Sequence, residues 1–265
     1  MSPFVAPTDS LGSVTLDLDE LDLLVHLLAV DELPVVLDAG PRFDSAAARD
    51  AAFTDAQESL TGRGLLPAGA PHPDVADWLA LLARPSAEIA LRWYTTGQAE
   101  ISRLCLVHGT AGELLALRGP NSYVLQPSEG QGPELLLDAV GRAAPLDFGP
   151  VNAPTDLLIG ALEDCANRVS TARRLTEIGV TEVDAGTLAA ALAGRRAHAE
   201  IVGIRHADAA VTQVGGPVTV FHTDRGRIVG TSSVSADGVA WTTLSPGTDA
   251  RLRRAIADLV TETGC

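Results

Sequence analysis

The apolar and polar positions follow a helical period up to about residue 83 and a strand period after it. Leucines and valines recur three and four residues apart in ELDLLVHLL, and alanine-rich helical runs follow it. The stretch PVVLD lacks this period and predicts a short strand. The predicted elements are a strand over 14–18, a helix with its N-cap at Asp19, a strand over 34–38, and helices over 44–60 and 74–82.

Four short runs of alternating character come next, separated by the turn sequences TTGQ, GTAG and GPN. Runs of this length with such turns are typical of an antiparallel meander. A helix is predicted after them over PELLLDAVGRA, residues 133–143. The runs are AEIALRWY (87–94), AEISRLCLVH (99–108), GELLALRG (112–119) and SYVLQP (122–127).

The second half of the chain repeats this order of elements. Helical runs over 156–169 and 187–197 precede four strand-like runs between 199 and 244, and an amphipathic helix over 248–260 ends the pattern. Ala87-Glu88-Ile89 recurs 112 residues later, and the pair His108 and Gly112 recurs 114 residues later as His222 and Gly226. The repeated order predicts an internal duplication.

A meander cannot bury its apolar face alone, so the two halves need each other or their own helices. We therefore expect an α+β fold with a central antiparallel sheet, built from two quasi-repeated helix–meander–helix halves and flanked by helical bundles. The stretch rich in proline and glycine near residue 150 is the natural boundary. The halves are predicted to be residues 1–150 and 151–265, joined in one integrated domain.

Composition and charge narrow the functional classes. The 265 residues are 46% hydrophobic and 20% charged, which suits a globular chain. The net charge is -15 and the chain has no lysine, so binding to nucleic acid or to an anionic membrane is not expected. No apolar run approaches the roughly 18 residues of a membrane span. The first arginine is Arg42, so the basic region of a secretory signal is missing and we expect a cytoplasmic protein.

The common catalytic and cofactor motifs are missing from the sequence. It has no P-loop, no HExxH, no GxSxG and no GxGxxG after a strand, and no cofactor is expected. Cys105 and His108 lie three residues apart on a predicted strand, so their side chains face opposite sides and do not easily pair as nucleophile and base. His198 and His206 have no evident third ligand for zinc. The cluster Asp17, Asp19, Glu20 and Asp22 is explained by helix capping.

The stretch FHTDRGRIV, residues 221–229, gathers His222, Asp224 and Arg225 near one turn. An unrecognised enzyme or small-molecule binder could use these three side chains. The corresponding stretch of the first half, VHGTAGELL, keeps only the histidine, the glycine and the flanking apolar residues. Those are the features that a hairpin needs, so the structural interpretation is favoured and the enzyme remains the alternative.

Trp93 and Tyr94 precede the first hairpin turn. Adjacent strand residues face opposite sides, so at least one of the two rings is open to exposure. Exposed aromatics beside a hairpin are frequent anchors of protein interfaces, whereas rings packed under helices would be structural. The sequence leaves both interpretations open.

The stretch 218–260 resembles the C-terminal part of the EspG family, which are ESX (type VII) secretion-associated proteins of actinobacteria. The likeness extends to the N-terminal half, although His222 stands where the family often has aspartate and the loop after Tyr94 is short. The matching residues are Thr223, Arg225, Gly226, Arg227, Asp237, Gly238, Trp241 and Pro246, with Leu33-Pro34, Arg63-Gly64-Leu65 and Arg84-Pro85 in front.

This resemblance implies a cytosolic chaperone without catalytic activity. Such a protein binds the apolar tip of a helical PPE protein within a PE–PPE heterodimer, and a homodimer of the chaperone is an open alternative. By this resemblance, the contact surface is expected at a hairpin loop of the first half together with the helices after Pro154. Carried onto this chain, the expected partner-binding residues are Arg92, Trp93, Tyr94, Thr95, Thr96, Gln98, Glu100, Leu157, Leu158 and Leu162.

Overall fold

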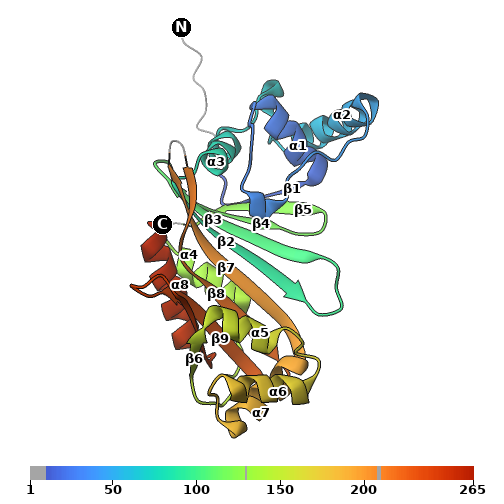
Figure 1. Cartoon of the computed structure of the whole chain (residues 1–265). Helices are drawn as coiled ribbons and strands as arrows, with labels where there is room; N and C mark the ends of the chain where they lie inside the picture. The colour runs from blue at the N-terminus through green and yellow to red at the C-terminus, as the bar shows by residue number, and fades with distance from the viewer. Residues whose placement is uncertain (1–9, 129, 208–209) are drawn as a thin grey trace.

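The protein is described by a computed structural model that covers residues 10–128, 130–207 and 210–265. Figure 1 shows one long sheet with a group of helices at each end. The first half contains β1 (Val14–Asp17), α1 (Leu18–Leu27), η1 (Val35–Leu37), α2 (Ala46–Gly62), η2 (Pro67–Gly69), α3 (Pro73–Ala83), β2 (Ala87–Thr95), β3 (Ile101–Gly109), β4 (Gly112–Arg118), β5 (Ser122–Pro127) and α4 (Gly132–Val140). The second half contains β6 (Val151–Pro154), α5 (Thr155–Leu162), α6 (Arg168–Glu177), α7 (Glu182–Ala193), β7 (Arg195–Ala207), β8 (Ala210–Thr223), β9 (Gly226–Val234), β10 (Ala240–Pro246) and α8 (Asp249–Thr263).

The ten strands of the described residues form one sheet in the order β1-β5-β4-β3-β2-β7-β8-β9-β10-β6, with antiparallel neighbours throughout. Each half places its meander in the same order from the centre outward. The strand that opens each half, β1 or β6, then closes the outer edge. The predicted α+β fold with a central antiparallel sheet is confirmed, whereas the division of the chain at residue 150 stays a prediction.

The two halves join where β2 pairs with β7, and Ala90 lies opposite Val202 at this joint. These two residues are 202 − 90 = 112 positions apart, which is the spacing of the repeated Ala-Glu-Ile. The predicted match of His108 with His222 holds at the turns, where His108 pairs with Glu113 and His222 pairs with Arg227, but the pairing with the preceding strand differs. Ala87 pairs with His108 whereas Ala199 pairs with Val220, because the β8–β9 hairpin is two residues longer than its counterpart.

Two predicted elements of the N-terminal segment differ in the structure. The stretch after Pro34 is one turn of 3₁₀ helix that inserts Val36 and Leu37 into the core, so it forms no strand. The N-cap of α1 is Asp17, whose carboxylate accepts from the backbone N–H of Glu20 at 2.8 Å. The carboxylate of Glu20 in turn accepts from the backbone N–H of Asp17 at 2.9 Å, and the two bonds form a capping box. Asp19 therefore lies inside the first turn and is not the N-cap.

The helices of the second half are also divided differently. The predicted helix over 156–169 is broken, and Asn167 caps a new helix, α6, by accepting from the Ser170 N–H at 3.1 Å. The predicted helix over 187–197 begins earlier, after the cap Thr181, and its last three residues already belong to β7. Strand β6 has no counterpart in the prediction because its residues, VNAP, lie in the stretch rich in proline and glycine that is predicted as the boundary.

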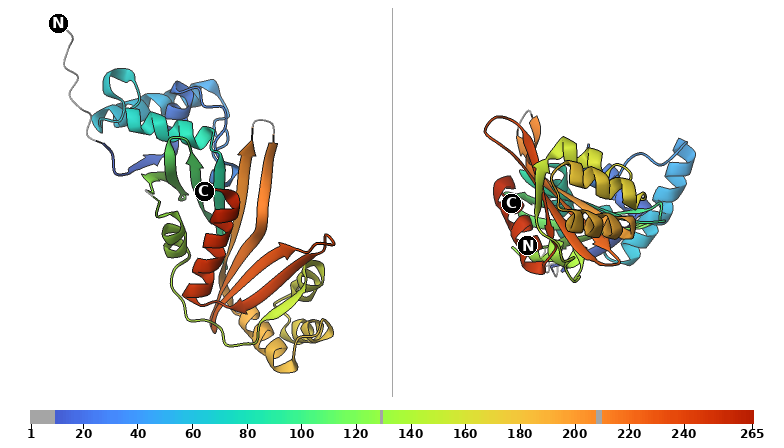
Figure 2. Two further views of the ribbon diagram at one scale, coloured as in Figure 1. Left: turned by 90° about the vertical axis from the view of Figure 1, so that its left-hand side faces the viewer. Right: turned by 60° about the horizontal axis from the view of Figure 1, so that its bottom comes forward.

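Three clusters of buried apolar residues lie against the sheet. The helices α1 to α3 cover one end of its first face, and α5 to α7 cover the other end of that face. The opposite face is covered by α4 and α8, and Figure 2 shows α8 across the sheet from α5. The predicted apolar stripe of α8 is buried through Leu252, Ile256 and Leu259, each contributing about 1.5–3 kcal/mol.

Arg227 is fully buried in β9, and its guanidinium joins three segments. Its Nε donates to the carbonyl of Gly247 at 2.7 Å, one terminal nitrogen donates to the carbonyl of Gly141 at 2.9 Å, and the other pairs with the carboxylate of Asp249. The backbone N–H of Arg227 also donates to the Ala144 carbonyl at 2.7 Å. The linker between the halves and the start of α8 are therefore tied to one side chain.

Replacing this arginine tests how much the fold depends on it. We expect Arg227→Met to lower the free energy of unfolding by about 3 kcal/mol, because two carbonyls lose their donors and each costs about 1–3 kcal/mol when left unpaired. Urea unfolding followed by circular dichroism measures the loss. The matched control is Arg225→Met at the exposed tip of the same turn, which should stay within about 0.5 kcal/mol of the original chain. Equal losses in the two variants would contradict the assignment.

Candidate partner-binding site

The two regions predicted to bind a partner lie side by side. The β2–β3 hairpin and the helices after Pro154 meet at a cleft of about 310 Å³. Thr96 lines it from the hairpin, Leu162 and Glu163 line it from the end of α5, and Ala193 and Arg195 line it from the step between α7 and β7. Segments more than sixty residues apart in the chain thus share one surface.

The hairpin is held at its base and exposed at its tip. The Thr96 N–H donates to the carbonyl of Arg196 at 2.8 Å, and the Thr96 hydroxyl donates to the carbonyl of Arg195 at 2.8 Å. Gly97 adopts a φ of 80°, a conformation that suits glycine, and the residues from 96 to 100 are exposed. The tip, including Gln98 and Glu100, is therefore presented from a fixed base.

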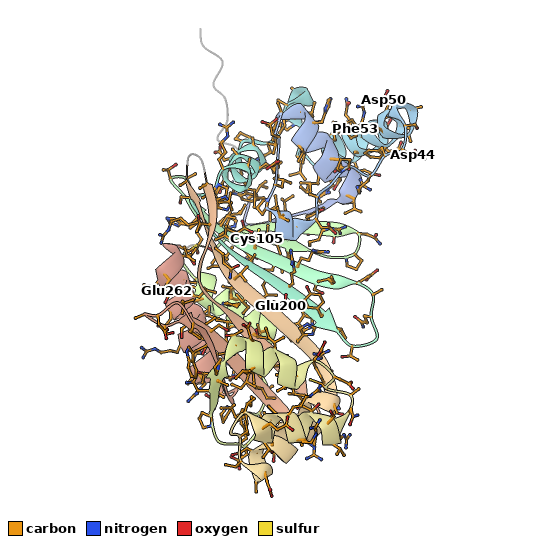
Figure 3. All side chains as sticks on the ribbon, in the orientation of Figure 1. Asp44, Asp50, Phe53, Cys105, Glu200 and Glu262 are labelled. Atoms are coloured by element: carbon orange, nitrogen blue, oxygen red, sulfur yellow. The ribbon has the colours of Figure 1, made fainter. Side chains whose placement is uncertain are left out.

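A row of three rings crosses the sheet beside this hairpin. The ring of Tyr94 stacks on the ring of His198 with centroids 4.5 Å apart and planes 8° apart, and the His198 ring lies 6.3 Å from that of Phe221. The residues sit opposite one another on β2, β7 and β8, and all three are half-buried. In the next row Arg92 faces Glu200, which Figure 3 labels on the middle of the sheet.

His198 is held in its neutral form by its position. Burial lowers the pKa of His198, and the positive charge of Arg195 lowers it further. Glu200 opposes this shift without reversing it. The stacked row is accordingly an uncharged aromatic surface at neutral pH.

The helix α5 leads into the cleft and exposes apolar side chains. Leu157 is 53% exposed and Ile159 is 62% exposed. Leu158 is only 3% exposed and packs in the core under α5 to α7, so its side chain is not at the surface here, and its expected contact with a partner stays a prediction. Leu162 is half-buried and lines the cleft, and its role as a contact residue stays a prediction.

Trp93 points to the other face of the sheet. Its ring lies edge-on to that of His222, with centroids 5.0 Å apart, and it packs against the core under α4 and α8. Tyr94 and Trp93 therefore cannot belong to one surface, because adjacent strand residues alternate. Both rings are half-buried, so neither is fully exposed nor fully covered.

The three side chains of the alternative hypothesis have three different surroundings. His222 packs on Trp93, and burial followed by the charge of Arg227 lowers the pKa of its imidazole. Asp224 forms an ion pair with Arg196. Arg225 is exposed at the turn, where its N–H donates to the Thr223 hydroxyl at 3.1 Å. The geometry is that of a two-residue hairpin turn between Thr223 and Gly226.

The cysteine thiols and the potential metal ligands are the remaining candidates for reactive groups. Burial raises the pKa of all three cysteine thiols, that of Cys265 to about 12, so these thiols are not nucleophilic at neutral pH. Within residues 10–128, 130–207 and 210–265, no cluster of three or more histidine, cysteine or acidic side chains is placed to hold a metal ion. No helix in that same part of the chain is both long and apolar enough to cross a bilayer.

The fold and this face define an α+β protein whose continuous sheet is left open on one side between two helical groups. A protein-family model identifies this class of protein. The chain belongs to the EspG family, whose model matches residues 17–258.

Individual relatives share this likeness along nearly the whole chain. The ESX-3 secretion-associated protein EspG3 of Mycobacterium tuberculosis (strain CDC 1551 / Oshkosh) is 25% identical, over 94% of this chain and 90% of that protein. The ESX-1 secretion-associated protein EspG1 of Mycolicibacterium smegmatis is 24% identical, over 98% and 92%. The solved structure of the Mycobacterium tuberculosis type VII secretion system chaperone EspG5 in complex with the PE25-PPE41 dimer matches with a TM-score of 0.78, 17% identity, and coverage of 95% and 96%.

Some residues of this face were missed by sequence reasoning. Ile159 belongs to a predicted helix that is apolar on every side, so the sequence could not indicate which of its side chains are exposed. His198 and Phe221 become neighbours of Tyr94 only through the pairing of β2, β7 and β8. The recurrence of Ala-Glu-Ile at the joint was the one signal that could have located this pairing.

The lowered pKa of His198 predicts a dependence of stability on pH. The unfolded chain accepts a proton near pH 6.5 that the folded chain resists, so this contribution is full above pH 6.5 and is lost as the pH falls through the folded-state pKa. We expect an NMR titration to give an imidazole pKa below 6.5. His198→Phe keeps a stacked ring and cannot titrate, so it should lose less unfolding free energy than the original chain between about pH 7.5 and about pH 5.5. An equal loss would contradict the prediction.

Proposed function

We propose that this protein is a cytosolic chaperone of a type VII (ESX) secretion system that binds the apolar tip of a helical PE–PPE-type substrate and keeps it soluble. The observation that carries the proposal is the meeting of the β2–β3 hairpin and α5 at one cleft. Membership in the EspG family supports it, as does the likeness to the chaperone EspG5 bound to PE25-PPE41.

The chemistry of the face suits such a partner. Leu162 lines the cleft, and Leu157 and Ile159 expose apolar area on the two flanks of α5, one on each side of the buried Leu158. Tyr94 adds a half-buried ring on β2. Gln98 and Glu100 form a polar rim on the hairpin. A protein interface typically has this arrangement of an apolar centre within a polar rim, so an apolar helical tip gains from burial here.

The proposed role requires no catalysis. The surroundings of His222, Asp224 and Arg225 support a structural turn rather than a reaction centre. Binding and release then depend on affinity alone, since no nucleotide or metal chemistry enters the proposal. Residence in the cytoplasm belongs to the same proposal, and a homodimer stays a prediction.

Co-expression with a PE–PPE pair from the same genome tests the function. We expect the chaperone to co-purify with the pair as one complex in size-exclusion chromatography, and to keep it in the soluble fraction. The expected stoichiometry is one chaperone for one heterodimer, because the cleft and α5 form a single face. If the pairs encoded near the chaperone neither co-purify nor gain solubility, the proposal fails.

A charge placed on the face should weaken the complex. Leu157→Arg would bury an unpaired cation against an apolar partner, so we expect the Kd to rise at least about tenfold, equivalent to about 1.4 kcal/mol. The matched control is Val183→Arg, which changes a residue that is 79% exposed in the first turn of α7, away from the cleft. Isothermal titration with the purified heterodimer measures both. A similar Kd for both variants would move the interface elsewhere.

A further inference from the structure

A second cavity, of about 410 Å³, lies on the open face where the two halves of the sheet join. Its floor is the β2–β7 joint, where the single methyl group of Ala90 faces Val202 and leaves space above the sheet. The segment 32–36 forms one wall, and Leu82 and Pro85 at the end of α3 form another. Most of this lining is apolar.

A buried carboxylate interrupts the apolar lining. Glu88 is 2% exposed, and its Oε2 lies 3.1 Å from Nε2 of His206. Its Oε1 has no hydrogen-bond partner within the described residues. Buried polar atoms in folded proteins are nearly always paired, so an unused acceptor beside a cavity points to a donor that arrives with a ligand.

The charges around the cavity favour a cation. Glu32, Glu88 and Glu200 line it, whereas the positive groups of the lining are Arg92 and, when protonated, His206. Arg92 lies opposite Glu200 in the strand register, and the partner of Glu88 is His206, which is a cation only when protonated. Burial raises the pKa of Glu88 and the neighbouring His206 opposes that shift, so a bound cation would favour the ionised carboxylate.

We propose that this cavity binds a small organic amine, whose apolar body fills the space over Ala90 and Val202 and whose ammonium group donates to Oε1 of Glu88. The two parts of such a ligand match the two parts of the site. A charge-assisted hydrogen bond is stronger than a neutral one, which explains how one buried carboxylate can select the ligand. The site goes beyond the proposed chaperone function, and neither depends on the other.

Other ligand classes fit the lining less well. An anion would meet three carboxylates. A metal ion would need several converging ligands, and the described residues hold no such cluster. A water molecule on Oε1 would satisfy the acceptor without using the apolar walls, so it is the outcome against which the amine has to be tested.

The experiment uses the full chain and two probes of equal shape, cyclohexylammonium and cyclohexanol, at about pH 7.5, where the amine is protonated. We expect saturable binding of cyclohexylammonium in an NMR titration, with shifts centred on the amides of Glu88, Ala90 and Val202. Cyclohexanol should bind at least about tenfold more weakly, since it cannot make the charge-assisted bond. Equal affinity for the two probes would mean that the carboxylate selects nothing, and no saturable binding of the amine at millimolar concentration would leave a water-filled cavity. Either result overturns the proposal.

Two variants assign the site, and a third serves as the matched control. Glu88→Gln keeps the shape and removes the charge, and should weaken amine binding by about tenfold to a hundredfold. Glu200→Gln removes an exposed rim charge and should change the affinity by less than about threefold. Ala90→Leu fills the floor while keeping Glu88, and should abolish binding of both probes. Circular dichroism checks that each variant folds, and amine binding unchanged in Glu88→Gln and Ala90→Leu would place the ligand elsewhere.

Discussion

The buried guanidinium of Arg227 is the constraint on which the joined fold depends. A charge without solvent contact must have its donors satisfied, and those of Arg227 reach the linker at Gly141, the step at Gly247 and the first turn of α8 at Asp249. The linker passes so close that a Cβ on Gly226 would lie 2.5 Å from the nitrogen of Leu146. The Arg-Gly-Arg turn is thereby explained residue by residue: an exposed arginine, a glycine required by the approach of the backbone, and a buried arginine that fixes three segments.

The pairing of β2 with β7 decides which surfaces remain available. The back of this joint is covered by α4 and α8, and the front lies between the two helical groups (Figure 1). The joint pairs without a bulge, and a small residue, Ala90, stands at its centre and leaves a cavity above the sheet. One joint therefore produces both the row of rings around Tyr94 and the pocket around Glu88, which lie at different positions along the strands on the same open face.

Local periodicity predicted most of the strands and the α+β class, because alternation and turn residues are visible within about ten consecutive residues. It failed where the tertiary neighbour decides: the stretch after Pro34 looks like a strand, but its apolar side chains enter the core from a 3₁₀ turn. Leu157 and Leu158 are identical in type, and only the packing of α5 makes one exposed and the other buried. Trp93 and Tyr94 were correctly expected to alternate, yet which of them lies on the open face of the sheet depends on strands more than a hundred residues away.

The charged turn that invites a catalytic interpretation has a mechanical role at the start of β7. Asp224 pairs with the side chain of Arg196, and its N–H donates to the carbonyl of Gly194 at 3.3 Å. The carbonyls of Arg195 and Arg196 accept the two hydrogen bonds from Thr96 that hold the β2–β3 hairpin. Both hairpins are thus anchored on the same three residues. The turn Thr110-Ala111 of the first half lacks these charges, so the two hairpins differ where the second one supports the proposed docking loop, and the charges of Asp224 and Arg196 help to position that loop.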